Sequence, residues 1–472
     1  MLDPTIFDRF TMGFALGVHI ILAVIGIVLP VMILIADYLW IKHGDRYYRA
    51  LSKRLSTALI VLFAVGTASG ILVAINLLVL WPAFMALVSK VAILPVYIEV
   101  FAFFTESIFL TIYIVYRDSF RNKNVRLFLM LMVAIGAAMS GVLITVFNSF
   151  MNTPVGFNIA AFNITSFLQN GSTLTDLNPV AVFTAPAVGI EVSHMLATTY
   201  FAGASIFLAY FAYMLLKTTD EKKRTYYKKA LKLTFAIVLI AIVLSIITGI
   251  LSIETLYHIQ PEKYAAIELD LRNISFAPEI IGGIYMNGVV QYGIAIPDLQ
   301  SMLATGSPSG FVPGLNQFPQ WTWPPLIVHD MFDFMFGLGV LQGLFAFVIL
   351  VLYIATIPIL YNIPIVYDII KFLETNLHIY MHDIFEDKTA LLLMIISGIL
   401  AVVMLEDGWL VDELGRQPWI IYNVMTVTQA GNQSTSIIPI AALIVIIYIV
   451  IIPLTYFVIK KIFSKRDLKK EL

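Results

Sequence analysis

Long apolar runs separated by short polar segments dominate the pattern of the chain. The runs span residues 13–40, 55–83, 92–116, 127–149, 187–216, 233–253, 326–360, 389–405 and 436–459. A helix needs about 20 apolar residues, or slightly fewer, to cross the hydrocarbon core of a bilayer. Because backbone groups in lipid must be satisfied internally, the pattern predicts an all-α, polytopic membrane helix bundle with about nine transmembrane helices.

The basic residues between these runs predict the orientation of the bundle. Lys and Arg gather after the first, third and fifth runs and in the C-terminal tail, whereas residues 149–193 contain neither. Positive charge is retained on the cytoplasmic side of a membrane. We therefore expect the N-terminus outside and the C-terminus in the cytoplasm. The opening sequence MLDPTIFDRF lacks the basic start of a signal peptide, so the first run is predicted to remain as a span.

Composition narrows the class of protein. Hydrophobic residues make up 60% of the 472 residues and charged residues only 12%, which is typical of a multi-pass protein of the cell membrane. The net charge of -1 argues against a nucleic-acid partner. Cysteine is absent. This excludes disulfides, iron–sulfur clusters and thiolate ligation, so any bound iron would take His, Met or carboxylate ligands.

One long polar segment interrupts the apolar pattern and suggests three regions. Residues 1–253 hold the first six spans, residues 254–325 form an outer loop, and residues 326–472 hold the last three spans. A loop of this length in a compact protein is usually functional or disordered.

The segment from Gly408 to Trp419, GWLVDELGRQPW, concentrates charge beside an apolar run. The charged residues here are Glu406, Asp407, Asp412, Glu413 and Arg416. Charges at such a place need partners. Two interpretations remain open on residue types alone: an aromatic anchor at the membrane interface, or a functional cluster.

Other polar residues lie inside the predicted spans. A histidine in lipid is costly unless it binds a metal or a hydrogen-bonding partner, which favours His19 and His194 as metal ligands. Met335 alone would be interpreted as a packing residue. Glu99 and Glu106 are seven residues apart, so both project from one helix face. Such a pair suggests a proton relay, although a single buried carboxyl could be a structural hydrogen-bond acceptor.

The string GWxxxExGRQPW resembles the signature of subunit I of the cytochrome bd quinol oxidases. The resemblance implies that Glu413 supplies an axial oxygen to a haem iron and that a low-spin haem b lies between His194 and Met335. It also implies a high-spin haem at His19. Further haem-contacting residues implied by the resemblance are Trp409, Arg416, Arg9 and Asn148.

The function implied by this resemblance is that of a terminal respiratory oxidase subunit. Quinol would be oxidised at the outer loop, where Lys263 and Glu268 match family positions, and dioxygen would be reduced to water. Protons would arrive from inside through Glu106, Glu99 and Ser140, building a proton motive force without a pump. The implied cofactors are three haems: a low-spin haem b, a high-spin haem b, and a haem d or a haem b in its place. The implied partner is subunit II in a heterodimer, with room for a small single-span subunit.

Two other hypotheses remain open. The family usually has an arginine two residues before the haem methionine, whereas this chain has Asp333. An anion there should lower the reduction potential of a nearby haem, so a haem-binding paralogue with altered quinol or oxygen chemistry is one alternative. The other is a proton or ion transporter without redox function. His378 and His382, in HIYMH, could bind a metal, but an interfacial helix is favoured because no third ligand is apparent.

Overall fold

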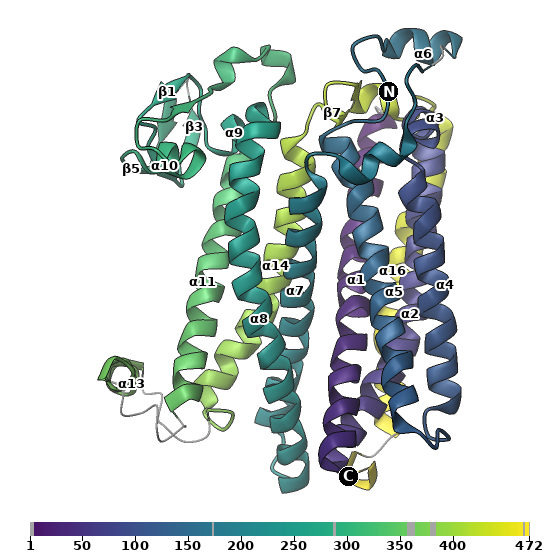
Figure 1. Ribbon diagram of the computed structural model, residues 1–472, viewed down its shortest axis with the longest axis vertical. Helices are drawn as coiled ribbons and strands as arrows, with labels where there is room; N and C mark the ends of the chain where they lie inside the picture. Colours follow the sequence, from purple (N-terminus) through teal and green to yellow (C-terminus); the bar gives the residue numbers. More distant parts are fainter. Residues whose placement is uncertain are drawn as a thin grey trace.

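The computed structural model describes residues 4–171, 174–286, 289–355, 364–377, 384–465 and 468–471 (Figure 1). His378 and His382 lie outside these residues. Within the described ranges, nine helices are long and apolar enough to cross a membrane, as the pattern predicts. They are α1 (Pro4–His43), α2 (Arg46–Leu80), α4 (Leu94–Tyr116), α5 (Lys123–Asn152), α7 (Val188–Lys217), α8 (Glu221–Ile259), α11 (Ile327–Ala355), α14 (Lys388–Gly415) and α16 (Ile438–Lys465).

These helices run side by side in two groups. Helices α7, α8, α11 and α14 form one side of the bundle, and α1, α2, α4, α5 and α16 form the other (Figure 1). The two groups meet where α1 and α5 pack against α7. Large apolar side chains such as Leu29, Ile33 and Phe201 fill the main core between them. The two chain ends lie at opposite ends of the bundle, as an odd number of spans requires (Figure 1).

Short elements gather at the end of the bundle where the N-terminus lies, which we call the outer end (Figure 1). The short helices there are α3 (Pro82–Val91), α6 (Ile164–Asn170), α9 (Pro261–Ile267), α10 (Leu299–Thr305) and α15 (Val427–Ala430). The strands are β1 (Ile274–Ser275), β2 (Glu279–Ile281), β3 (Ile284–Met286), β4 (Val289–Gln291), β5 (Ile294–Ile296), β6 (Phe311–Val312), β7 (Trp419–Ile421) and β8 (Met425–Thr426). They pair as antiparallel ribbons β1–β6, β2–β5, β3–β4 and β7–β8.

The described part of residues 268–318 forms the outer lobe, which projects sideways from the ends of α8 and α11 (Figure 1). Its ribbons are only two or three residues long per strand. Ribbons this short are not stable alone, so contacts with the helices must hold the lobe in place. Val312 and Ala277 pack with Tyr264 of α9, and His329 of α11 hydrogen-bonds to the backbone of Gly282.

Two helices extend further than the apolar runs. Helix α14 continues to Gly415, so Glu413 lies in its last turn and not just beyond its end. Helix α8 reaches Ile259, six residues into the segment assigned to the loop. Hydrophobicity marks the part of a helix that lies in lipid, whereas hydrogen-bonding partners allow a helix to continue through polar sequence.

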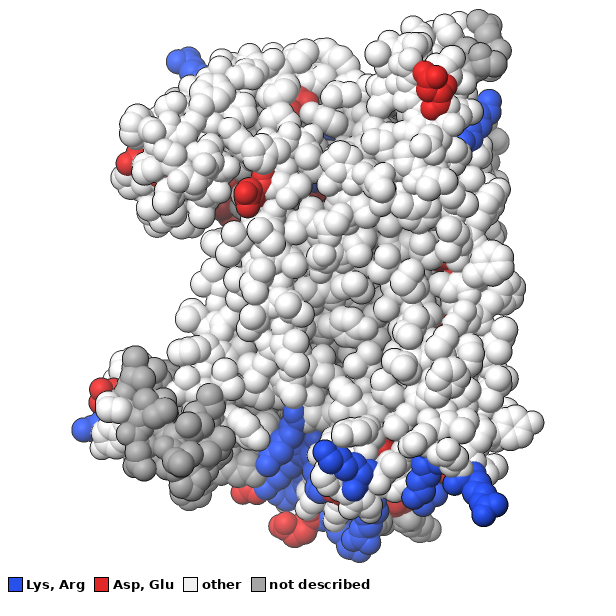
Figure 2. Space-filling view, viewed as in Figure 1, with Lys and Arg blue, Asp and Glu red and all other residues white. Residues whose placement is uncertain are grey.

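Charged residues divide the two ends of the molecule. Figure 2 shows that Lys and Arg gather at the end where the C-terminus lies, whereas the outer lobe is nearly free of them. At the basic end, Arg126 donates to both oxygens of Asp37 at 2.7 Å, and the Tyr113 hydroxyl donates to the same carboxylate at 2.7 Å. These three buried residues, the inner cluster, join α1, α4 and α5. Helix α13 (Pro364–Leu377) lies across the bundle axis near this end (Figure 1).

Candidate functional site

His19 projects from α1 toward α2 and has one ring nitrogen fixed. Its Nδ1 lies 2.8 Å from the Ser69 hydroxyl oxygen, and that hydroxyl donates to the Gly66 carbonyl at 2.7 Å. With the Ser69 hydroxyl donating to Gly66, this geometry assigns Nδ1 of His19 as the donor to the Ser69 oxygen. The lone pair is then on Nε2, which is the form of neutral imidazole that binds a metal. A side chain at Gly70 would lie 3.2 Å from the ring, so glycine makes room for it.

His194 on α7 has the same arrangement. Its Nδ1 lies 3.0 Å from the Thr248 hydroxyl of α8, which donates to the Leu244 carbonyl at 2.8 Å. Here too Nδ1 is the donor and Nε2 keeps its lone pair. A Cβ placed at Gly249 would lie 3.5 Å from Cε1 of the His194 ring, in van der Waals contact. Two intramembrane histidines are therefore held in a metal-binding form by hydroxyls of neighbouring helices.

Met335 of α11 lies against the GWLVDELGRQPW segment. Its sulfur would be 3.1 Å from a Cβ placed at Gly408 of α14. Helix α14 also packs against α7, which carries His194. The thioether and this imidazole thus project from the same four-helix side of the bundle.

Arg416 anchors the end of α14 although it is only 2% exposed. Its Nη2 donates to Glu413 at 2.6 Å, and its Nη1 donates to Asn152 at 2.8 Å and to Asn148 at 3.3 Å. The Glu413 side chain keeps 39% of its surface exposed. The guanidinium therefore orients a carboxylate that still has room to bind a further group.

Several buried polar atoms of the described residues have no hydrogen-bonding partner. They include Nε of Arg416, Nε1 of Trp81, Nε1 of Trp419, both amide atoms of Asn76, Oε1 of Glu406 and Oδ2 of Asp407. All lie near the outer ends of α2 and α14. Buried polar groups are normally paired, so this concentration indicates a missing polar partner. A side chain at Gly13 or Gly66 would meet no atom within 4 Å. Open space and orphaned donors beside His19 and Glu413 fit haem groups with their propionates.

Ser140 and Glu99 are in contact. The Ser140 hydroxyl of α5 donates to Glu99 of α4 at 2.5 Å. Glu106 follows on the same face of α4 and is 8% exposed. The helices approach closely here, because a Cβ at Gly136 would lie 2.8 Å from the Glu106 nitrogen. The two carboxyls thus lie one after the other along α4, where this helix packs against α5.

Lys263 is buried and binds α14. Its Nζ donates to the Asp412 carboxylate at 2.5 Å and to the Asp412 carbonyl at 3.0 Å. The Lys263 stem crosses Gly415, where a Cβ would lie 2.7 Å from the Lys263 Cε. Lys263 therefore joins the outer loop to the end of α14. Arg9, in contrast, has an exposed side chain at the start of α1.

Glu268 belongs to a group of buried carboxyls at the base of the outer lobe. It is 4% exposed and hydrogen-bonds to Glu279 of β2. Burial, followed by the neighbouring carboxylates of Glu279 and Asp270, raises the pKa of Glu268 well above its usual value. Burial also raises the pKa of Asp270 to about 7. Burial and the hydrogen bond between them therefore favour a proton on the Glu268–Glu279 pair, and the pKa of each carboxyl is raised.

Asp333, which replaces the family arginine, is directed at the outer lobe. It accepts a hydrogen bond from the Gly282 backbone and lies 3.5 Å from Nε2 of His329. Nδ1 of His329 lies 2.6 Å from the Ile267 carbonyl. The carboxylate thus ties α11 to the β2–β3 turn, and these contacts offset part of its charge.

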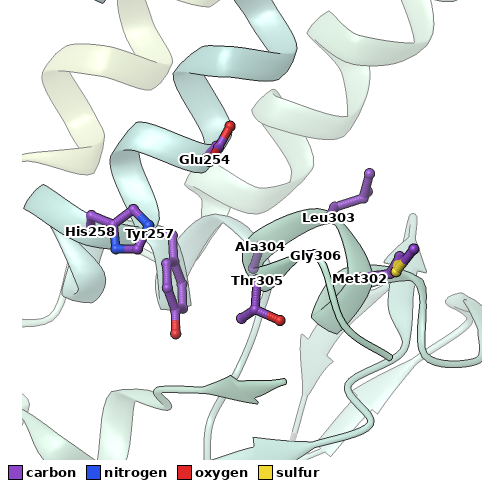
Figure 3. Close-up of a pocket in the computed structure, with 8 residues that line it drawn as sticks. All are labelled: Glu254, Tyr257, His258, Met302, Leu303, Ala304, Thr305 and Gly306. Carbon is purple, nitrogen blue, oxygen red and sulfur yellow. The ribbon is translucent and has the colours of Figure 1, made fainter. Parts of the chain in front are cut away.

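A cavity of about 420 Å³ opens between α8 and α10. It is lined by Glu254, Tyr257 and His258 of α8 and by residues 302–306. Figure 3 shows Tyr257 and Thr305 side by side, with their hydroxyls on the same side. The Tyr257 hydroxyl donates to the Phe311 carbonyl at 2.8 Å, which fixes the wall of the cavity.

The sequence analysis missed Asn152 and left Asp412 and Glu191 without roles. Asn152 lies one turn after Asn148, so its position on the same helix face was the available signal. The contacts of Asn152 depend on residues far apart in the chain, including Arg416. Such contacts are not encoded in any local pattern.

Comparisons with known proteins agree over nearly the whole chain. Residues 7–467 match the family model described as cytochrome bd terminal oxidase subunit I. The putative cytochrome bd menaquinol oxidase subunit I of Bacillus subtilis (strain 168) is 32% identical, with 100% of this chain and 99% of that protein covered. The cytochrome bd ubiquinol oxidase subunit 1 of the same strain is 27% identical, with 89% and 84% covered. The structure of bd oxidase from Geobacillus thermodenitrificans superimposes with a TM-score of 0.84 at 32% identity, covering 98% of this chain and 99% of that one.

Proposed function

This chain belongs to the cytochrome bd terminal oxidase subunit I family, and from that premise we propose how its residues divide the work of the enzyme. Family membership makes it a membrane-integral, haem-binding subunit of a terminal quinol oxidase. It also decides against a transporter without redox function. The proposal concerns the haem ligands, the quinol site, the proton route and the partners.

Three haems fit the ligands that the chain offers. His194 and Met335 would hold a low-spin haem b, and His19 and Glu413 would hold two high-spin haems, of which one is a haem d or a haem b in its place. When bound, the haems supply the one-electron carriers and the iron at which dioxygen is reduced. The free Nε2 of each histidine and the orphaned donors of Arg416 and Trp419 support this assignment.

We assign quinol oxidation to the outer lobe and its base, within residues 254–325. The Glu268–Glu279 pair would accept a quinol proton and release it outside, because the two carboxyls are hydrogen-bonded to each other and burial raises the pKa of both. The cavity beside Tyr257 adjoins the exposed apolar face of α8, from which a lipid-soluble quinol could enter. The relatives are named menaquinol and ubiquinol oxidases, so either quinol is a candidate substrate.

Protons for oxygen reduction would come from the opposite end of the bundle. Glu106 would pass them to Glu99, which the Ser140 hydroxyl orients. The basic end of the molecule would face the cytoplasm, as the gathering of Lys and Arg supports (Figure 2). Electrons taken from quinol at the outer side and protons taken from the inner side would then build a proton motive force without a pump.

A subunit I implies a subunit II partner. We propose that the two form a heterodimer in the cell membrane, with the N-terminus of this chain outside and its C-terminus in the cytoplasm. A small single-span subunit could join them.

The observation that carries the proposal is the pair of imidazoles held with Nε2 free. The test is a reduced-minus-oxidised visible spectrum of the purified enzyme with total haem analysis. His194→Ala should remove the low-spin bands alone, and His19→Ala should remove high-spin absorption. His43→Ala, at the exposed inner end of α1, is the control and should keep every band. A purified wild-type protein without iron, or variants with the wild-type spectrum, would refute the assignment.

A further inference from the structure

We infer that Asn152 is a positioning residue that fixes the quinol-side helix α9 to the haem-ligating end of α14, so that the two ends of the electron path are coupled. This inference rests on the proposed function. It concerns a side chain that neither the sequence pattern nor the family resemblance assigned.

Asn152 is fully buried, and both its amide nitrogen and its amide oxygen are hydrogen-bonded. Its Nδ2 donates to Glu191 at 2.8 Å and to Asp412 at 3.3 Å, and its Oδ1 accepts from Arg416 at 2.8 Å. Its carbonyl oxygen accepts from the Gln260 side chain at 3.0 Å. Two carboxylates face the amide nitrogen and a guanidinium faces the oxygen, so only one orientation of the amide satisfies all partners.

The partners of Asn152 lead to both ends of the proposed electron path. Asp412 binds Lys263 of α9, next to the quinol-side lobe, while Arg416 binds the proposed haem ligand Glu413. Glu191 lies one turn before His194 on α7 and also accepts from Ser149. Helices α5, α7 and the end of α14 therefore meet at this one amide, and α9 is joined to it through Asp412.

The Asp412 carboxylate explains why these contacts should act together. One of its oxygens binds both Lys263 and Asn152, and the other binds Asn148. A rotation of this carboxylate would break bonds on the quinol side and on the α14 side at once. Networks of shared, buried hydrogen bonds respond as units and not as independent pairs.

Asn148 provides the contrast. Among the described residues, its side chain hydrogen-bonds to Asp412 and Arg416 and not to Glu191 or Gln260. Its loss should disturb the end of α14 without releasing α7. Comparison of the two asparagines therefore separates a general loss of buried polar contacts from a coupled arrangement.

The test uses the purified enzyme with its partner subunit. Asn152→Leu should raise the KM for quinol by about tenfold or more and shift the absorption and midpoint potentials of both the low-spin and high-spin haems. Loss of the hydrogen-bonding partners that orient metal ligands lowers affinity or activity by about 10–100-fold. Asn148→Leu should shift the high-spin haems but leave the low-spin haem at His194 unchanged, because the bond to Glu191 of α7 is made by Asn152. Thr153→Val changes a buried neighbour outside this set of contacts and should match the wild type.

A second variant decides the matter even if Asn152→Leu does not assemble. Lys263→Met changes a side chain of α9, so a coupled arrangement predicts a shifted spectrum of the high-spin haems. Where both variants are measured, the effect of Lys263→Met should be non-additive with that of Asn152→Leu. High-spin bands unchanged in Lys263→Met would overturn the inference. So would an Asn152→Leu enzyme that behaves like Thr153→Val. An enzyme that binds haem and oxidises quinol in either case leaves the proposed function intact, whereas absence of haem from the wild type refutes that function itself.

Discussion

At the scale of single residues, hydroxyl groups decide which histidine nitrogen is available. Ser69 and Thr248 each accept from a histidine Nδ1 while donating to a backbone carbonyl of their own helix. Partners of this kind fix the tautomer and ring orientation of a ligand.

Removal of one hydroxyl should therefore affect one haem. Ser69→Ala should lower the affinity for the haem at His19 by about tenfold, and Thr248→Val should do the same for the haem at His194. Haem titration of purified apoprotein, followed by the spectrum, measures both. Each variant serves as the control for the other, and equal loss of both haem types in either one would contradict the prediction.

Glu99 provides a second residue-scale prediction. Glu99→Gln keeps the shape of the side chain and its contact with Ser140 but removes its ability to carry a proton. We expect oxygen consumption to fall by about 100-fold or more, in the range that acid–base groups contribute. Haem content should stay normal. Unchanged oxygen consumption at normal haem content would remove Glu99 from the mechanism.

At the scale of elements, the fit between α9 and α14 depends on the absence of a side chain. Gly415→Ala would place a methyl group 2.7 Å from the Lys263 stem. We expect destabilisation of about 1–3 kcal/mol from overpacking, seen as a lower Tm, together with a raised KM for quinol. Gly26→Ala is the control, since no atom lies within 4 Å of its added methyl. A Tm equal to that of Gly26→Ala would show that the Lys263 side chain can move aside without a cost in stability.

The outer lobe should loosen as pH rises. Burial raises the pKa of Asp270 to about 7 from an ordinary value near 3.8. The folded lobe therefore binds this proton more tightly than the unfolded chain, so the associated stability is complete below about pH 4 and is lost as pH rises to 7. Limited proteolysis of the lobe should be faster at pH 8 than at pH 5.

Asp270→Asn should remove much of this pH dependence, with its largest protection relative to the wild type at pH 8. Asp298→Asn, elsewhere in the lobe, is the matched control and should retain the wild-type profile. The ratio of the cleavage rate at pH 8 to that at pH 5 is the quantity to compare. The same ratio for Asp270→Asn and the wild type would contradict the assignment to Asp270.

At the scale of the whole molecule, the sequence predicted what the lipid environment imposes. Span number followed from hydrophobicity, and His19, His194 and Glu99 stood out because polar groups in lipid need partners. The extension of α14 to Gly415 and the contacts of Asn152 did not follow, because both depend on residues brought together from distant parts of the chain. The strands of the outer lobe are also too short to show the alternation of apolar and polar residues by which strands are recognised in a sequence.

The inner cluster should contribute to the stability of the whole bundle. Asp37→Leu would leave the buried Arg126 guanidinium without its carboxylate, at a cost of about 3–5 kcal/mol. We expect a clearly lower Tm in detergent. Asp118→Asn removes a carboxylate that is 48% exposed and pairs at 3.5–3.8 Å with Arg49, Arg117 and Arg126, and it should change stability by less than about 1 kcal/mol. Similar Tm values for the two variants would show that the buried pair is dispensable.

The same cluster also has an electrical consequence. An oxidase that charges a membrane must not let that charge leak back through its own helices. Asp37, Arg126 and Tyr113 pair with one another where α1, α4 and α5 meet, and the apolar side chains of Leu110, Met130 and Val133 are buried in the same core. A substitution that lets water and protons enter this cluster should cause a proton leak. The enzyme in liposomes would then still consume quinol and oxygen while the membrane potential fell.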